Sequence, residues 1–171
     1  MREILFRGFC KCKGGKGKIF LDGKWHKGKW VKGCYFVAKD KNFNILHYIS
    51  EIKGENMFKI IPETVGQYTG LRDKHKNRIF EGDIFKFDDE VWESYYTSCG
   101  TEYNSWNIEN YGVVGFNEET GCYDFVKYKF NENSVEADLH ENNTLIFHEF
   151  VSKLEIIGNI YDNPELLEVK K

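Results

Sequence analysis

Three patterns in this 171-residue sequence contain residue types that bind phosphate, cleave peptides or ligate zinc. The first, Gly23–Trp30, follows the spacing of a phosphate-binding loop, but Trp30 stands where a Ser or Thr hydroxyl would bind Mg²⁺. The second, His148–Ser152, begins like a zinc-protease helix, but Ser152 replaces the second His. Because neither pattern is complete, the sequence predicts neither activity.

The third pattern involves cysteine. The chain opens with a three-residue apolar run between charged residues, which is too short for a signal peptide, so we expect a reducing compartment and free thiols. Alternate residues of a strand point to opposite faces, which disfavours joint ligation by a Cys-X-Cys pair. Zinc therefore stays open beside ordinary reduced cysteines for the one candidate set, Cys10, Cys12, His26 and Cys34. No catalytic residue and no cofactor is predicted.

Composition favours strands over helices in the elements that must position these residues. The chain has 14 Phe, 10 Tyr and 4 Trp, whereas alanine occurs only at Ala38 and Ala137. Aromatic residues suit pleated surfaces, and alanine is the best helix former. No apolar stretch approaches the roughly 20 residues that span a bilayer. We expect a mainly β protein that does not enter a membrane and stays in the cytoplasm.

The first 61 residues predict a basic β-meander, because short apolar runs alternate with turn-forming clusters. These runs cover residues 36–40, 43–49 and 58–61. Pro62 restricts the preceding residue to extended conformations and turn formers follow it, so we place a boundary between residues 1–61 and 62–171.

The section 62–171 predicts five short strands, a spacing that suits a small barrel. They cover residues 79–87, 112–116, 122–130, 144–151 and 154–161, with a hairpin turn at Asn117–Gly121. In the first of them, Phe85 and Phe87 fall on one face. Asn163 and Pro164 suit the start of one short C-terminal helix.

Charge is divided unevenly along the chain. Residues 1–61 contain 14 Lys and Arg against 5 Asp and Glu, whereas residues 62–171 contain 10 against 22, so the two sections should attract one another. Eight lysines lie between Lys11 and Lys32 against the single acid Asp22. Lysines neutralise phosphates and indoles stack on bases, so this segment is a candidate for binding single-stranded nucleic acid. The candidate residues are Lys16, Lys18, Lys24, Trp25, Lys27, Lys29, Trp30 and Lys32; the alternative is a solvated hairpin end blunted by lysine.

Residues 88–110 predict a long loop between two strands of the barrel. Loops longer than about 12–15 residues inside a compact domain are usually functional or disordered, and one with five large rings is a poor candidate for disorder. The alternative is that its rings cap the barrel core. The candidate partner-binding residues are Trp92, Tyr95, Tyr96, Tyr103 and Trp106.

Several segments together resemble the YopX family of bacteriophage and prophage proteins. They are residues 2–7, Trp30–Gly33 with Tyr35, 62–71, 79–84, 157–161 and 163–167. The resemblance implies an SH3-type small barrel in the C-terminal part, preceded by a β-rich N-terminal section, in a phage-encoded protein of a family without an established activity. It implies the cytoplasm of a bacterial host as location. Where the family tends to have Asn-Gly in the turn after Leu71, this chain has His75-Lys76.

Three hypotheses of function follow. The first is a non-enzymatic protein-binding module that engages a basic host or phage protein, or a second copy of itself, through the aromatic loop and the acidic section. The second is single-stranded nucleic-acid binding through the segment 11–32. An enzyme whose site only the tertiary fold assembles comes third.

Overall fold

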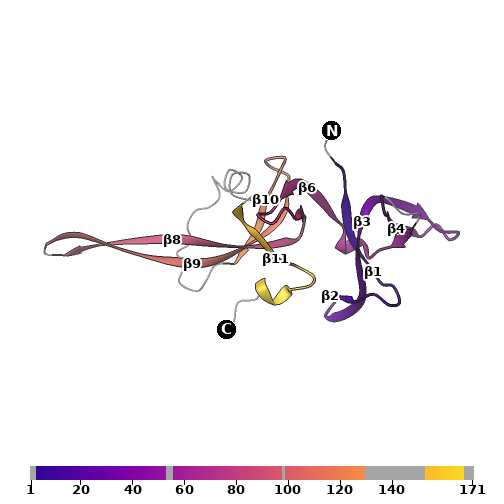
Figure 1. The fold of residues 1–171 in the computed structure, drawn as a ribbon, viewed down its shortest axis with the longest axis horizontal. Coiled ribbons are helices and arrows are strands. Elements are labelled where there is room, and N and C mark those ends of the chain that lie inside the picture. Colours follow the sequence, from indigo (N-terminus) through magenta and orange to yellow (C-terminus); the bar gives the residue numbers. More distant parts are fainter. Residues whose placement is uncertain (1–2, 53–55, 98, 130–152, 168–171) are drawn as a thin grey trace.

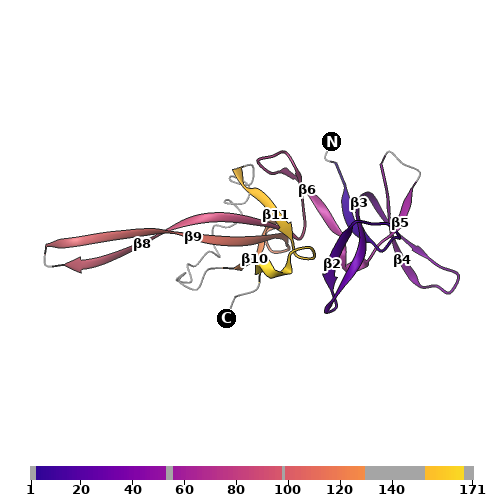
Figure 2. The same ribbon diagram turned by 60° about the horizontal axis from the view of Figure 1, so that its bottom comes forward.

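The computed structural model describes residues 3–52, 56–97, 99–129 and 153–167, and these form two antiparallel sheets (Figure 1). The predicted mainly β class is thereby confirmed. The two sheets lie side by side along the long axis of the molecule, with a long two-stranded arm projecting from the second sheet away from the first (Figure 2).

The first sheet has seven strands in the described part of the chain, in the order β5-β4-β3-β1-β6-β7 with β2 also paired to β3. They are β1 (Phe6–Cys10), β2 (Gly17–Leu21), β3 (Lys24–Lys39), β4 (Ile45–Ser50), β5 (Met57–Lys59), β6 (Gly66–Arg72) and β7 (Arg78–Phe80). A single 3-10 turn, η1 (Pro62–Thr64), joins β5 to β6.

Strand β3 organises this sheet because three partners follow one another along it. It pairs with β2 over residues 24–28, with β1 over residues 29–33 and with β4 over residues 34–39. Gly28 permits the first crossing, since a Cβ there would lie 2.0 Å from the carbonyl oxygen of Cys10. One glycine of the lysine-rich segment therefore serves a close backbone approach rather than a turn.

The second sheet has the strand order β10-β9-β8-β11. Its strands are β8 (Asp83–Thr97), β9 (Gly100–Asn117), β10 (Cys122–Lys129) and β11 (Glu155–Asn159). The predicted turn between β9 and β10 is confirmed: Gly121 N–H donates to the Asn117 carbonyl at 2.9 Å. The predicted shared face of Phe85 and Phe87 is confirmed as well, since both rings contact Phe125.

The prediction of a loop over residues 88–110 is wrong. Residues 88–97 belong to β8, residues 100–110 belong to β9, and the two strands pair continuously from Ile84↔Val113 to Thr97↔Gly100. The reason is that Tyr, Trp, Thr and Val have a high β propensity, and paired strands satisfy backbone groups that a loop would leave to water.

The predicted strand 79–87 is two strands. Gly82 has a positive φ of 80° and ends β7, and its N–H donates to the Val114 carbonyl at 2.8 Å, so the chain turns there from the first sheet into the second. The sheets therefore change after Phe80. The division expected at Pro62 differs from this one, because β6 pairs with β1 through Phe6↔Gln67 and continues the first sheet.

The described strands form open sheets rather than a closed barrel. The predicted strand 144–151 lies outside the described residues. The expected C-terminal helix is one 3-10 turn, η4 (Pro164–Leu167), and no α-helix occurs in the described chain; four residues are too few for stable α-helical turns. None of the described helices has the length and apolar character that crossing a membrane requires.

Three buried clusters make up the core of the part of the chain that the structure describes. One lies within the first sheet around Val31, Ile49 and Ile60. Another joins β7 to the second sheet and contains Ile79, Phe85, Val114, Tyr123 and Phe125. The third, Leu5, Tyr68 and Phe80, lies beside the place where the two sheets meet.

Candidate functional site

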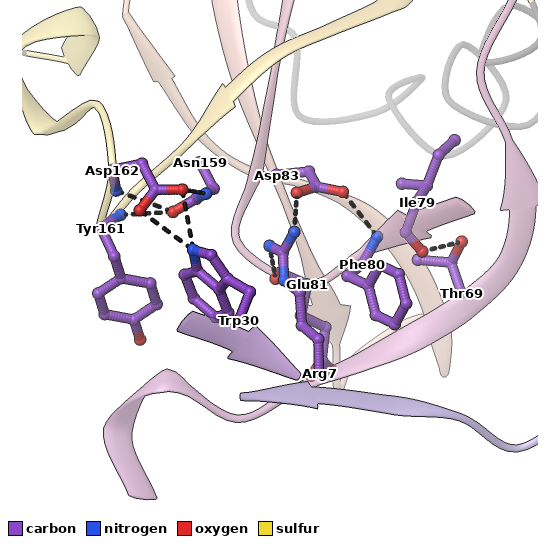
Figure 3. Close-up of polar contacts among 10 residues, drawn as sticks. All are labelled: Arg7, Trp30, Thr69, Ile79, Phe80, Glu81, Asp83, Asn159, Tyr161 and Asp162. Atoms are coloured by element: carbon purple, nitrogen blue, oxygen red, sulfur yellow. Dashed lines mark hydrogen bonds and ion pairs between the residues drawn. The ribbon is translucent and has the colours of Figure 1, made fainter. Parts of the chain in front are cut away.

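A buried ion pair connects the two sheets (Figure 3). Arg7 on β1 and Asp83 at the start of β8 are 8% and 2% exposed, and Arg7 Nη1 contacts Asp83 Oδ1. Arg7 Nη2 donates to the Glu81 carbonyl at 2.8 Å, and Phe80 N–H donates to the second carboxylate oxygen of Asp83 at 2.8 Å. The guanidinium lies between the Trp30 and Phe80 rings, 5.1 and 5.2 Å from their centroids. Both partners are thus engaged by several groups.

A second polar contact lies next to this pair. Trp30 Nε1–H donates to the Asp162 carboxylate at 2.9 Å, and Asn159 Nδ2 donates to the same carboxylate at 2.6 Å. The Trp30 ring also contacts the Phe9 ring. It lies beside the Tyr161 ring as well, with 6.0 Å between the ring centroids (Figure 3). Trp30 therefore links β3 to the chain that follows β11.

The place where Arg7 meets Asp83 and Trp30 meets Asp162 is here named the junction. Burial and the charged groups there change the pKa values of Asp83 and Lys32. Burial raises the pKa of the Asp83 carboxyl, although Arg7 and the Phe80 N–H act to lower it. Burial, and then the Arg7 charge, lower the pKa of Lys32, whose Nζ lies 5.1 Å from the Phe80 ring centroid. A shifted carboxyl pKa is a common mark of catalysis, but here the carboxylate faces a guanidinium and a backbone N–H inside the fold. The arrangement joins the two sheets.

The predicted nucleic-acid-binding residues are divided by the structure. The register places Trp25 with Phe20, and Lys27 with Lys18, on one face of the β2–β3 hairpin. Trp25 is 49% exposed, its ring lies 5.4 Å from that of Phe20, and Lys18 Nζ lies 4.8 Å from its centroid. This cluster of Lys18, Phe20, Trp25 and Lys27 is here named the Trp25 patch.

The remaining candidates lie elsewhere. Trp30 and Lys32 are part of the junction, and Lys29 Nζ lies 3.9 Å from the Phe58 ring centroid. Lys24 pairs with Leu21 on the face opposite Trp25, and Lys16 precedes β2. The two indoles therefore do not form one surface. Their five-residue separation within a single strand is the signal for this, because odd separations alternate faces.

The predicted partner-binding residues all lie on the arm, which is defined as residues 87–97 and 100–110. The backbone register pairs Trp92 with Ser105, Tyr95 with Glu102 and Tyr96 with Thr101, and it pairs Tyr103 with Ser94 and Trp106 with Val91. The arm contains six Asp and Glu and no Lys or Arg. Strands β10 and β11 pair only with the base of the hairpin, so no third described strand pairs with the arm.

The cysteines are free thiols in the described structure. Cys10 ends β1, and Cys12 N–H donates to the Cys10 carbonyl at 3.0 Å, so the chain turns and the two side chains share a hydrogen bond instead of diverging. Burial, and then Cys12, raise the pKa of Cys10 to about 11. No cluster of three or more His, Cys, Asp or Glu suited to a metal occurs among the described residues, so Cys10, Cys12, His26 and Cys34 do not gather.

A family profile described as YopX protein matches residues 24–168. The chain belongs to the YopX family. This is a phage-associated family, as the sequence resemblance indicated. A comparison with curated proteins finds no match.

The segments that resemble the YopX family meet at the junction between the sheets (Figure 3). Arg7, Trp30 and Asp83 come from three different segments, and Asn159 and Tyr161 come from a fourth. In this chain, these segments therefore contribute polar contacts that join the two sheets. Sequence reasoning found the segments but missed the contacts, because partners such as Arg7 and Asp83 lie 76 residues apart.

Proposed function

We propose that this YopX-family chain is a non-enzymatic protein-binding module that engages a basic protein surface through the arm. The observation that carries the proposal is the arm itself, a projecting two-stranded ribbon with six Asp and Glu residues, five Trp and Tyr residues and no basic residue (Figure 1). Its eleven pairs, from Phe87↔Asn110 to Thr97↔Gly100, span about 35 Å at the usual rise per residue.

Physical arguments connect this shape to binding. A two-stranded ribbon is marginally stable alone in water, so an arm of this length gains from a surface that covers one of its faces. Rings give large contact areas, and carboxylates steer the encounter toward a basic partner. The buried, mutually engaged charges of the junction supply the rigid base from which the arm projects.

The proposal is tested by shortening the arm without changing its turn or its base. Deletion of residues 91–96 together with 101–106 removes six consecutive pairs, and the even number keeps the alternation of faces. Wild-type and shortened chains would be used to capture proteins from a bacterial lysate at low salt. We expect basic proteins that elute with salt from the wild type only. Identical captures with both chains, at equal stability, would contradict the proposal.

The SH3-type barrel implied by the family resemblance stays a prediction. The cluster of Ile79, Phe85, Val114 and Phe125 supports it, because it packs β7 of one sheet against the other sheet. The segment 144–151 is the predicted strand that would be needed to close the second sheet.

The Trp25 patch favours a second candidate function, binding of single-stranded nucleic acid. An exposed indole beside a second ring and two lysines offers stacking and charge neutralisation together. Titration with a single-stranded oligonucleotide at low salt should quench tryptophan fluorescence, with an affinity that falls steeply with salt. Trp25→Leu should remove the quenching while the junction indole Trp30 remains, and unchanged wild-type fluorescence would end this hypothesis.

A further inference from the structure

The chain contains the same turn twice. Asp40–Asn44 and Asp73–Asn77, named here the Asp40 turn and the Asp73 turn, share the pattern Asp-x-x-x-Asn. In each, one Asp oxygen accepts from the N–H groups two and four residues later, and the other accepts from the Asn side chain. In each, the fourth residue is left-handed: φ is 62° at Phe43 and 66° at Lys76.

Phe43 is an unusual residue for that position. The left-handed region favours glycine and asparagine, and a bulky ring there is an outlier that indicates a role beyond the turn. Lys76 shows that the turn itself needs no ring. Yet Phe43 is 79% exposed, which leaves most of its apolar surface in water.

Other apolar side chains continue this surface. Val37 and Ile45 are 50% and 59% exposed, and the pairs Val37↔His47 and Lys39↔Ile45 place both on one face of the β3–β4 hairpin. Lys39 and Lys41 flank Asp40, whose carboxylate the turn already engages. Phe43, Val37 and Ile45 thus form an exposed apolar tip with a basic rim.

The arm has the complementary character. The register pairs Tyr95 with Glu102, with Glu93 and Trp106 close by along the two strands, so this stretch of the arm combines aromatic and acidic residues. The arm and the β3–β4 hairpin extend from opposite ends of the molecule, as both views show (Figures 1 and 2). They therefore cannot meet within one chain, but they can meet between two.

We propose that the apolar tip of one copy docks on the stretch of the arm that contains Glu93 and Glu102 in a second copy, giving head-to-tail association. Apolar and aromatic surfaces supply the contact, and Lys39 and Lys41 against Glu93 and Glu102 set its orientation. Because the two surfaces differ, the contact is heterologous and adds further copies until a ring closes or a filament forms. This rests on the proposed function in that the arm is the binding element.

Sedimentation velocity of the full chain over a range of concentration and salt tests the proposal. We expect species larger than a monomer at high concentration and low salt, dissociating as salt rises. Phe43→Ser should weaken association on the order of tenfold or more, as loss of an aromatic anchor does. Lys76→Ser, at the same position of the matched turn, should leave it unchanged.

Charge exchange identifies the two surfaces. Lys39→Glu with Lys41→Glu, and Glu93→Lys with Glu102→Lys, should each abolish self-association, and mixing the two variants should restore association in which the two variants alternate. A wild type that stays monomeric under all conditions overturns the proposal, as does association that survives in the arm-shortened chain. If the wild type is monomeric and only the wild type captures basic lysate proteins, the arm function stands and self-association fails.

Discussion

In both the Asp40 turn and the Asp73 turn, one carboxylate accepts hydrogen bonds from backbone N–H groups of the next residues, and the fourth residue has a left-handed backbone conformation. Their surroundings differ. Asp73 is 3% exposed, and Lys74 ties its turn to the second sheet through the Leu154 carbonyl at 3.0 Å and Glu155 at 2.5 Å. The hydrogen bonds that hold the Asp40 turn are internal to it, and it presents Phe43 to solvent.

This difference shows that the local sequence sets the shape of the turn, whereas the place of the turn in the fold decides its role. The Asp73 turn anchors the β6–β7 hairpin against the second sheet. The Asp40 turn carries the Phe43 ring, which the hydrogen bonds of the turn do not require. Buried and exposed versions of one polar arrangement should therefore respond differently to the same substitution.

The largest effect is expected at another buried carboxylate, Asp83. Arg7→Met would leave it without its cation inside the fold, and removing one partner of a buried pair costs about 3–5 kcal/mol. The matched exposed pair, Arg78 with Glu3 at 2.9 Å, should lose no more than about 1 kcal/mol in Arg78→Met. Urea unfolding of both variants measures the contrast, and equal losses would mean that Asp83 is not buried as described.

The next effect separates the two turns. Asp73→Ala leaves partly buried N–H donors of His75 and Asn77 without their acceptor, and we expect the free energy of unfolding to fall by about 1–3 kcal/mol. Asp40→Ala should cost clearly less, because water reaches its donors. The same denaturation experiment tests both, and a larger loss for Asp40→Ala would reverse the comparison.

Glycine at the left-handed position should stabilise both turns. Lys76→Gly and Phe43→Gly remove a strained backbone at the cost of unfolded-chain entropy, for a net gain of about 0.5–1 kcal/mol each. The two should differ in function, since only Phe43→Gly should also weaken self-association. Thermal unfolding together with sedimentation gives both readings, and a loss of stability in either variant would contradict the described backbone.

The smallest effect concerns pH. Hydrogen bonds from Asn44 lower the pKa of Asp40, and at Asp73 hydrogen bonds from Asn77 and His75 outweigh burial and also lower the pKa. A lowered folded pKa adds stability above the ordinary value of 3.8, and this is lost as pH falls through the folded value. Asp73→Asn should flatten this part of the acid limb of a stability–pH profile more than Asp40→Asn. An unchanged profile in both would contradict the turn geometry.

Part of this structure could be predicted from the sequence. Alternating residues predicted the common face of Phe85 and Phe87, and the residues around Gly121 predicted its hairpin, because such signals depend on a few neighbouring residues. The sequence did not predict the arm, because a loop and a long hairpin rich in Tyr and Trp can have the same residues and differ only in whether two strands pair. The Asp73 turn has no Asn-Gly pair. The Asp73 carboxylate instead accepts the hydrogen bonds that hold the Lys76 backbone in the left-handed conformation.

Sequence alone determined the β class, the family and the uneven division of charge, since composition and short segments carry these. Only the tertiary structure decided that Trp25 and Trp30 face apart, that Arg7 meets Asp83, and that an acidic arm and an apolar tip lie at opposite ends of the molecule. The physical reason is the distance along the sequence over which each interaction acts. Strand propensity and turn chemistry act over a few residues, whereas strand pairing and burial join residues that the sequence keeps far apart.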